Sequence, residues 1–169
     1  HAWQLETDRL ILRRLRQEDA PHILELVNEP GFLAYIGDKQ IRTLQDARRY
    51  ILTEGPGACY RDHGFGLYHL SCRATGQALG ICGLVHRGEA FPDLGYALLQ
   101  RFEGHGYAME AASAIIIHAR QDLGLPRVLA FTHPDNDRSI RILVRLGFIE
   151  DPQFQTGRDA TTRVFALAL

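Results

Sequence analysis

Apolar positions along this chain recur with two different periods, and the change between them separates the predicted helices from the predicted strands. Steps of three and four residues place apolar side chains on one face of a helix, whereas alternation or a short apolar run is typical of a strand. Proline and glycine at 30–31, 55–57 and 124–126 are expected to end helices. The predicted helices cover residues 17–28, 43–53, 104–123 and 135–147. The predicted strands cover residues 10–15, 65–70, 79–85, 94–99, 128–132, 148–149 and 163–169.

This order of elements is β-α-α-β-β-β-α-β-α-β-β, which places the chain in the mixed α/β (α+β) class. The three strands between residues 65 and 99 follow one another closely, so we expect them to form an antiparallel meander. One strand–helix–strand crossover follows in the second half of the chain. No repeat or linker divides the sequence, and we expect a single domain over residues 1–169, with residues 1–4 expression-derived or disordered.

Composition narrows the class of function without choosing one. The chain has 169 residues and a mass of 19.0 kDa, with 46% hydrophobic and 23% charged residues, as an ordinary globular core requires. Its formal net charge of -1 argues against nucleic-acid binding through bulk positive charge, and no apolar run has the length of a membrane span. The three cysteines form no C-x-x-C pair, so we expect a reduced, cytoplasmic protein without a disulfide framework or a metal site.

The segment from Leu98 to Ala108 carries the most chemistry. A predicted strand ends here, a turn holds Gly104 and Gly106, and a long helix begins with small residues. A helix start offers unpaired backbone N–H groups and the positive end of the helix dipole, and glycine removes the side chains that would block a phosphate. The turn therefore favours a diphosphate site, with a plain connection between strand and helix as the open alternative.

Two well-known phosphate-binding patterns are absent from this segment. The chain has no G-x-x-x-x-G-K-[ST] run, and a G-x-G-x-x-G pattern would need glycine where Met109 stands. Residues 101–106 instead fit the pattern [QR]-x-x-G-x-[GA]. In this the chain resembles the GNAT superfamily of acetyl-coenzyme A-dependent N-acetyltransferases, whose coenzyme-binding motif has this form.

Two further segments support the resemblance, which extends over nearly the whole chain. Residues 136–148 are similar to the second GNAT signature, an Asn-x-x-Ser helix that ends in Leu-Gly-Phe. Residues 5–10, Leu-Glu-Thr-Asp-Arg-Leu, resemble the branch of ribosomal-protein alanine N-acetyltransferases. The resemblance implies a GNAT-like mixed, mostly antiparallel sheet that is split between its fourth and fifth strands and flanked by about four helices. Acetyl-coenzyme A would lie in the split as a cosubstrate.

The resemblance also assigns the residues that would hold this cosubstrate. Backbone groups at the end of the strand would hold the pantetheine, N–H groups of the turn would hold the diphosphate, and an asparagine on the next helix would donate a hydrogen bond. The asparagine also suits the N-cap of that helix, and the two roles are compatible. The implied residues are Leu98, Leu99, Arg101, Phe102, Glu103, Gly104, His105, Gly106, Tyr107 and Asn136.

The reaction itself requires few side chains. A neutral amine attacks a thioester, so one group must take a proton from the ammonium and another can protonate the departing thiolate. Glu89 and Asp93 are the candidate bases, acting directly or through water, although solvated loop carboxylates are the simpler interpretation of both. Ser139 is the candidate acid, because many relatives have a tyrosine where this chain has Leu143.

We therefore expect direct attack of a primary amine on acetyl-coenzyme A in a ternary complex. A protein N-terminus competes with a small-molecule amine, such as an antibiotic, a polyamine or an amino acid derivative, as the acceptor. A non-catalytic module that senses acyl-coenzyme A is the alternative from another class. The sequence leaves open whether the protein forms a homodimer, and it gives no reason to expect a nucleic-acid or membrane partner.

Overall fold

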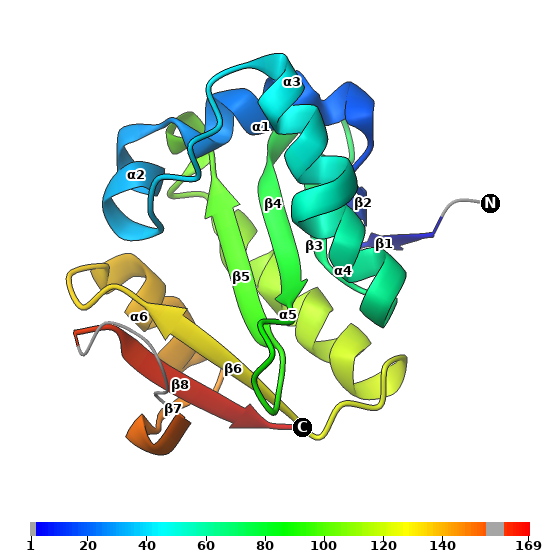
Figure 1. Ribbon diagram of the computed structural model, residues 1–169. Helices are drawn as coiled ribbons and strands as arrows, with labels where there is room; N and C mark the ends of the chain where they lie inside the picture. Colours follow the sequence, from blue (N-terminus) through cyan, green and yellow to red (C-terminus); the bar gives the residue numbers. More distant parts are fainter. Residues whose placement is uncertain (1–2, 155–160) are drawn as a thin grey trace.

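The computed structural model describes residues 3–154 and 161–169, and one sheet of eight strands forms its centre (Figure 1). The order of the strands across the sheet is β1-β2-β3-β4-β5-β6-β8-β7. All neighbouring strands are antiparallel except β5 and β6, which are parallel, so the predicted mixed and mostly antiparallel sheet is confirmed. The strands are β1 (Gln4–Glu6), β2 (Leu10–Arg14), β3 (Leu67–Cys72), β4 (Ala78–Val85), β5 (Asp93–Leu98), β6 (Arg127–Thr132), β7 (Ile149–Glu150) and β8 (Arg163–Ala168).

The described residues form six α-helices, two more than the sequence predicts. The helices are α1 (Ala20–Val27), α2 (Pro30–Tyr35), α3 (Leu44–Arg49), α4 (Pro56–His63), α5 (Tyr107–Gln121) and α6 (Asp137–Arg145). The additional helices α2 and α4 begin at prolines that were expected only to end helices. Proline also suits the first turn of a helix, where its missing N–H group has no partner to lose. No described helix is long and apolar enough to cross a membrane.

The start of the chain differs from the sequence prediction as well. Gln4 belongs to β1, and the Trp3 ring lies 4.5 Å from the Tyr68 ring, between ring centroids. The expectation of disorder is therefore wrong for Trp3 and Gln4, while residues 1 and 2 lie outside the described part of the chain. A three-residue edge strand is too short to show a period of its own.

Helices cover both faces of the sheet. On one face, α5 presents Ala111, Ala112 and Ile115, which are fully buried against the sheet. Small side chains let the axis of α5 approach the strands closely. On the opposite face, α1 buries Ile23 and Leu26, and Figure 1 shows α1 and α3 on the other side of the sheet from α5. The central strands are thereby fixed from both sides.

The sheet is split between β5 and β6. These strands pair at one position, Asp93 with Leu129, near the beginning of each strand, where the Leu129 N–H group also donates to the Pro92 carbonyl at 2.9 Å. Beyond this point they diverge, as Figure 1 shows. The split lies between the fourth and fifth of the strands predicted from the sequence, as the resemblance implied.

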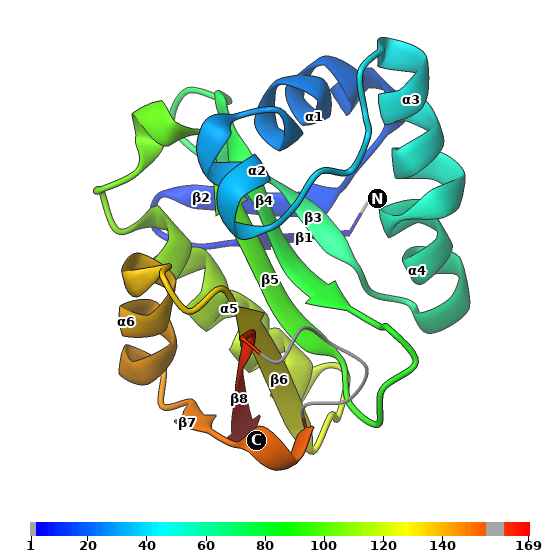
Figure 2. The ribbon, with the colours of Figure 1, turned by 60° about the vertical axis from the view of Figure 1, so that its left-hand side comes forward.

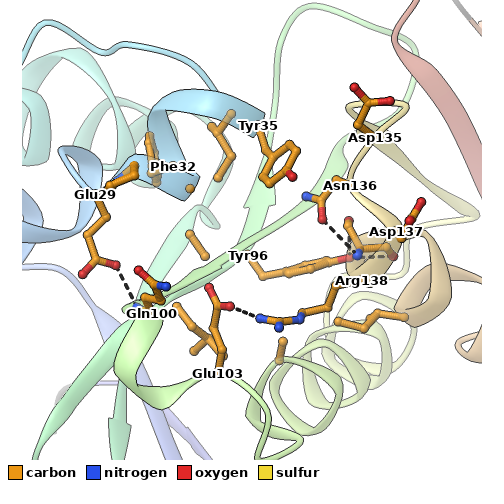
Figure 3. A pocket seen from close by; sticks show the side chains of 18 of the residues that line it. Glu29, Phe32, Tyr35, Tyr96, Gln100, Glu103, Asp135, Asn136, Asp137 and Arg138 are labelled. Atoms are coloured by element: carbon orange, nitrogen blue, oxygen red, sulfur yellow. Dashed lines mark hydrogen bonds and ion pairs between the residues drawn. The ribbon is translucent and has the colours of Figure 1, made fainter.

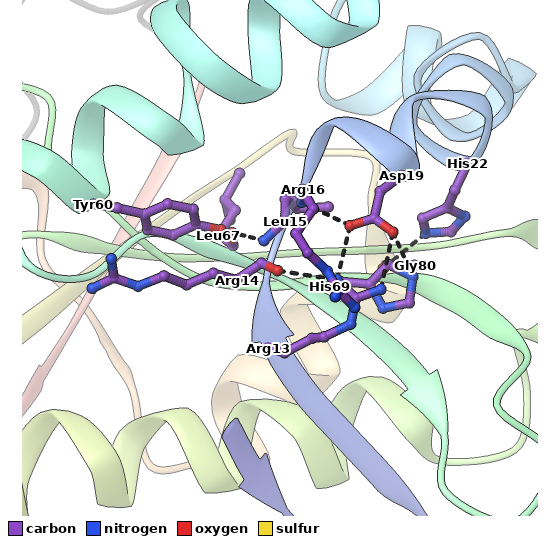
Figure 4. A network of polar contacts seen from close by, with 10 residues as sticks. All are labelled: Arg13, Arg14, Leu15, Arg16, Asp19, His22, Tyr60, Leu67, His69 and Gly80. Atoms are coloured by element: carbon purple, nitrogen blue, oxygen red, sulfur yellow. Dashed lines mark hydrogen bonds and ion pairs between the residues drawn. The ribbon is translucent and has the colours of Figure 1, made fainter. Parts of the chain in front are cut away.

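A buried polar network connects β2 and β3 to the first helical turns (Figure 4). The Arg13 guanidinium donates to both carboxylate oxygens of Asp19, at 2.8 and 2.9 Å. His69 lies beside this pair with its Nε2 atom 3.9 Å from Asp19, and its Nδ1 atom is buried without a hydrogen-bond partner. Burial lowers the pKa of His69 to about 4, so the ring is neutral at pH 7.

Candidate active site

Two adjoining cavities lie along the split. The outer cavity has a volume of about 490 Å³ and is bordered by α2, the end of β5 and the beginning of α6 (Figure 3). The inner cavity has a volume of about 140 Å³ and extends toward the beginning of β5. Side chains of Phe32, Tyr35, Tyr96, Asn136 and Ser139 line both cavities. The two cavities therefore adjoin at these residues, and ligands in them would lie next to each other.

The backbone N–H and carbonyl groups of successive β5 residues point alternately toward β4 and toward β6. The Leu99 N–H group donates to the Leu79 carbonyl at 2.9 Å, on the side of β4, whereas the Pro92 carbonyl accepts from β6. Because successive residues of a strand direct their backbone groups to opposite sides, the groups of Tyr96 and Leu98 face the split. The backbone groups of Leu98 are therefore open to an extended ligand in the split, and its role in binding stays a prediction. The backbone groups of Leu99 are not open, because its N–H group is occupied and its carbonyl accepts from Phe102 at 2.9 Å.

The glycine turn that precedes α5 has the geometry of an anion site. Gly104 and Gly106 have φ values of 83° and 81°, a left-handed conformation that side chains other than glycine rarely adopt. A Cβ atom on Gly104 would meet no atom within 4 Å, so the turn presents open backbone. No side chain caps α5, and the amides of its first turn have no partner within the helix. These features fit a diphosphate.

The side chains around this turn have separate positions. Glu103 lines the outer cavity, whereas the Arg101 guanidinium donates to Glu25 at 2.6 Å, and Phe102 packs against both cores. His105 is exposed, so only its backbone belongs to the turn. The prediction that this segment binds through backbone groups is compatible with these positions.

Ser139 and Tyr96 meet where the split opens. The hydroxyl groups of the two residues are 2.8 Å apart, so one donates to the other across the gap between β5 and α6. Burial raises the pKa of Tyr96 to about 12, which keeps its phenol protonated. Asn136 caps α6 by accepting from the Ser139 N–H group at 3.3 Å, and it lines both cavities. Tyr96 was not predicted as a site residue, because its only signal in the sequence was a polar hydroxyl within a predicted strand.

The two candidate bases have different surroundings. Asp93 is buried, lines the inner cavity and accepts from Arg87 Nε at 3.0 Å. Glu89 lies in the connection between β4 and β5 and is not among the residues that line either cavity. Of the two, the structure brings only Asp93 to the split. Among the described residues, no cluster of three or more histidine, cysteine or acidic side chains could hold a metal ion.

Two carboxylates lie at the outer cavity, Glu29, which the sequence did not single out, and Glu103, which belongs to the predicted turn. Glu29, at the beginning of α2, accepts from the Gln100 N–H group at 2.8 Å. Glu103 forms an ion pair with Arg138 across the cavity, and Figure 3 shows the two side chains pointing toward each other. These contacts connect α2 and α6 to the two ends of the segment that follows β5.

Comparison with known proteins now decides the family. The acetyltransferase (GNAT) domain matches residues 9–149, which is most of the chain. The protein belongs to the GNAT acetyltransferases. The chain is 26% identical to the uncharacterized N-acetyltransferase YoaA of Bacillus subtilis, over 96% of this chain and 95% of that protein. The GNAT family uses acetyl-coenzyme A, and the protein is accordingly an acetyl-coenzyme A-dependent N-acetyltransferase.

Solved structures show the same GNAT fold. An acetyltransferase from Agrobacterium tumefaciens superposes with a TM-score of 0.85 at 27% identity, over 100% of this chain and 96% of that one. RimL, a ribosomal L7/L12 α-N-protein acetyltransferase in complex with coenzyme A, superposes with a TM-score of 0.82 at 17% identity, over 99% and 98% of the two chains. At this identity, the second likeness shows the fold alone.

Proposed function

We propose that this protein transfers an acetyl group from acetyl-coenzyme A to a primary amine by direct attack in a ternary complex, with a protein N-terminus as the acceptor. The observation that carries the proposal is that the two cavities adjoin and share lining residues, among them Tyr96 and Ser139. The outer cavity begins beside the glycine turn and ends at Ser139, and the inner cavity extends from Ser139 to Asp93. A cosubstrate along the first and an acceptor in the second would meet at the split.

In this proposal, each side chain performs one step. Asp93 accepts a proton from the acceptor ammonium, through water, so that the neutral amine can attack the thioester carbonyl. Arg87 holds the Asp93 carboxylate in place at 3.0 Å. The Ser139 hydroxyl donates to the thiolate as the carbon–sulfur bond breaks, and Tyr96 orients that hydroxyl at 2.8 Å. Leu98 and the turn residues 101–107, with Asn136, hold the cosubstrate.

The surroundings of the inner cavity support a peptide acceptor. With a volume of about 140 Å³, the cavity accommodates little more than the α-amine and the side chain of the N-terminal residue of a peptide. The remainder of a peptide would have to lie outside, where α2 and its C-terminal end offer Leu33, Tyr35 and Ile36 as exposed apolar side chains. A small-molecule amine is the second candidate, and the modest size of the same cavity is the observation that favours it.

A screen of acceptors tests the proposal. Purified protein with acetyl-coenzyme A would be given N-terminal peptides, the same peptides with a blocked α-amine, polyamines, aminoglycosides and amino acids, and release of free thiol would be followed. We expect release only with free peptide N-termini. Release with the small amines alone would assign the second candidate. Binding of acetyl-coenzyme A without release in any arm would indicate a sensor.

A further inference from the structure

The N-terminal segment that carries the resemblance to the ribosomal-protein branch lies beside the glycine turn. Thr7 and Arg9 occupy the connection between β1 and β2, and both bind Glu110 in the first turn of α5, about a hundred residues later. Arg9 Nε donates to Glu110 Oε1 at 2.7 Å, and the Arg9 N–H group donates to Oε2 at 3.0 Å. The Thr7 hydroxyl donates to the same Oε2 atom and accepts from the Leu10 N–H group at 3.0 Å. Figure 2 shows this connection next to the start of α5.

Arg9 also contacts the turn directly. Its Nη1 atom donates to the His105 carbonyl at 2.9 Å, and its guanidinium lies 4.6 Å above the centre of the Tyr107 ring. A Cβ atom on Gly106 would lie 3.4 Å from Arg9 Nη2. One side chain thus contacts His105 and Tyr107 and lies beside Gly106 between them. Although burial would raise the pKa of Glu110, hydrogen bonds from Thr7 and Arg9 lower it below its usual value, so the carboxylate stays charged.

The turn needs such support because of its two glycines. Glycine permits the left-handed conformation that exposes the amides, but it also gives the turn many other conformations. Backbone donors bind a ligand tightly only when their positions are fixed before binding, since otherwise the ligand must supply the ordering free energy. Charge-assisted hydrogen bonds are strong enough to select one conformation.

We propose that Thr7, Arg9 and Glu110 form an N-terminal brace that holds the Gly104–Gly106 turn in the conformation that binds the diphosphate of acetyl-coenzyme A. These are positioning residues, and the inference rests on the proposed use of the turn in cosubstrate binding. The brace gives the Thr7-x-Arg9 part of the N-terminal segment a physical role in this chain.

A simpler electrostatic role makes an opposite prediction. If Arg9 only attracted phosphate by its charge, removal of the nearby Glu110 carboxylate would remove a repulsive charge and strengthen cosubstrate binding. If the brace holds the turn, Glu110→Ala releases both Arg9 and Thr7 and weakens binding. The sign of the Glu110→Ala effect therefore separates the two accounts.

The experiment measures the Kd for coenzyme A by calorimetry and steady-state kinetics with the acceptor found in the screen. Arg9→Gln and Glu110→Ala should each raise the Kd about tenfold, the double variant no more than about twofold further, and kcat at saturating acetyl-coenzyme A should change little. Thr7→Val should raise the Kd, whereas Thr7→Ser, which keeps the hydroxyl, should not. Arg163→Gln is the matched control, because Arg163 binds Glu150 in a similar pair at 2.8 Å that is remote from the turn.

The outcomes distinguish the brace from the proposed function. Unchanged Kd values in folded variants, additive effects of Arg9→Gln and Glu110→Ala, or tighter binding by Glu110→Ala would each overturn the brace. Equal weakening by Arg163→Gln would also overturn it. If the wild type binds coenzyme A and shows these differences but acetylates no amine, the brace stands and the proposed function fails. Melting temperatures fix the range in which all variants are folded.

Discussion

The cosubstrate side and the reaction side of the proposed site are formed by different kinds of groups. The cosubstrate side is the turn proposed to bind the diphosphate, where two left-handed glycines expose backbone amides at the start of α5. The reaction side, where the amine would react, consists of side chains from separate elements: Tyr96 on β5, Ser139 on α6 and Asp93 at the start of β5. A local sequence pattern encodes the cosubstrate side, whereas the reaction side exists only after the strands and helices have assembled.

This difference predicts how each side tolerates substitution. A backbone site depends on conformation. Replacing one of its glycines by a residue that disfavours a positive φ should therefore weaken binding and leave the chemical step unchanged. A side-chain site depends on particular functional groups, so an isosteric change should damage the reaction while the cosubstrate still binds. The following experiments test this division.

Gly106→Val should have the largest effect. Its φ of 81° is strained for a β-branched residue, at a cost of roughly 1–3 kcal/mol, and its side chain would also press on Arg9, whose Nη2 atom lies 3.4 Å from the Cβ position. We expect the Kd for acetyl-coenzyme A to rise by about a hundredfold, which calorimetry measures directly.

Gly76→Val is the matched control for backbone strain. Gly76 has a φ of 76° in the turn between β3 and β4, and a Cβ atom there would meet no atom within 4 Å. Gly76→Val should lower the free energy of unfolding by about as much as Gly106→Val and keep the wild-type Kd for acetyl-coenzyme A. Unchanged affinity in Gly106→Val, or an equal loss in both variants, would contradict the assignment of the turn. ATP and NAD should bind poorly to the wild type, because the chain has neither of their glycine patterns.

The same division explains what the sequence could predict. The turn was found because its chemistry lies in successive residues, 101–107, followed by a recognisable amphipathic helix. Tyr96 was not predicted because nothing near it in sequence indicates that α6 brings Ser139 to its hydroxyl. The resemblance implied both Leu98 and Leu99, and only the pairing with β4 shows which of the two faces the split.

The fold follows a similar rule. Long periodic segments were predicted well, since α5 covers Tyr107–Gln121 within the predicted range 104–123. Three short elements were not predicted: α2, α4 and β1 have three to eight residues each, and proline at a helix start was interpreted as a stop. Tertiary packing decides such segments more than their own composition does.

Ser139→Ala should have the next largest effect, on kcat. Its hydroxyl binds Tyr96, and the helix cap is supplied by Asn136, so loss of the hydroxyl should cost little stability. We expect kcat to fall by roughly ten- to a hundredfold with the Kd for acetyl-coenzyme A nearly intact, as single-turnover rates would show. Normal turnover in Ser139→Ala would remove this residue from the catalytic set.

Two companion variants sharpen the result for Ser139. Tyr96→Phe keeps the ring and removes the phenol, so a smaller loss of kcat, with no further loss in the double variant, would show that Tyr96 acts through Ser139. Asn136→Ala should lower the free energy of unfolding by about 1 kcal/mol, since it removes the cap of α6. Stability loss in Ser139→Ala of the same size, without a kinetic effect, would indicate a structural role.

Asp93→Asn should have a smaller effect on the rate. Only a neutral amine attacks, so the rate should rise with pH toward an alkaline plateau in the wild type. We expect Asp93→Asn to lower kcat at pH 7 by roughly tenfold, more than it raises the KM for acetyl-coenzyme A, and the loss should shrink on the plateau. Glu89→Gln should keep the wild-type rate, because Glu89 does not line either cavity. Full rates in both variants would assign the proton to water alone.

His69 should affect stability and leave the reaction unchanged. Its pKa is about 4 in the folded protein and 6.5 in the unfolded chain, because burial and the Arg13 charge disfavour the imidazolium, although the Asp19 charge favours it. The folded state therefore binds fewer protons than the unfolded state between these values. Stability is fully present above pH 6.5 and falls as the pH decreases toward 4, by at most roughly 3 kcal/mol.

His69→Gln tests this contribution, since glutamine does not titrate. Denaturant unfolding at pH 7 and at pH 4 should show a smaller difference between the two pH values in the variant than in the wild type, whatever the packing cost at pH 7. The variant retains Asp19 and Arg13. Although burial would raise the pKa of Asp19, hydrogen bonds lower it below its usual value, so both proteins should lose stability below pH 4 as this carboxylate is protonated. His133→Gln, at a half-exposed histidine outside the buried network, is the control for the removal of an imidazole. If the free energy of unfolding of His69→Gln depends on pH as in the wild type, the buried ring does not determine acid stability. The value of kcat at pH 7 should be the same in all three proteins, because the network lies outside both cavities.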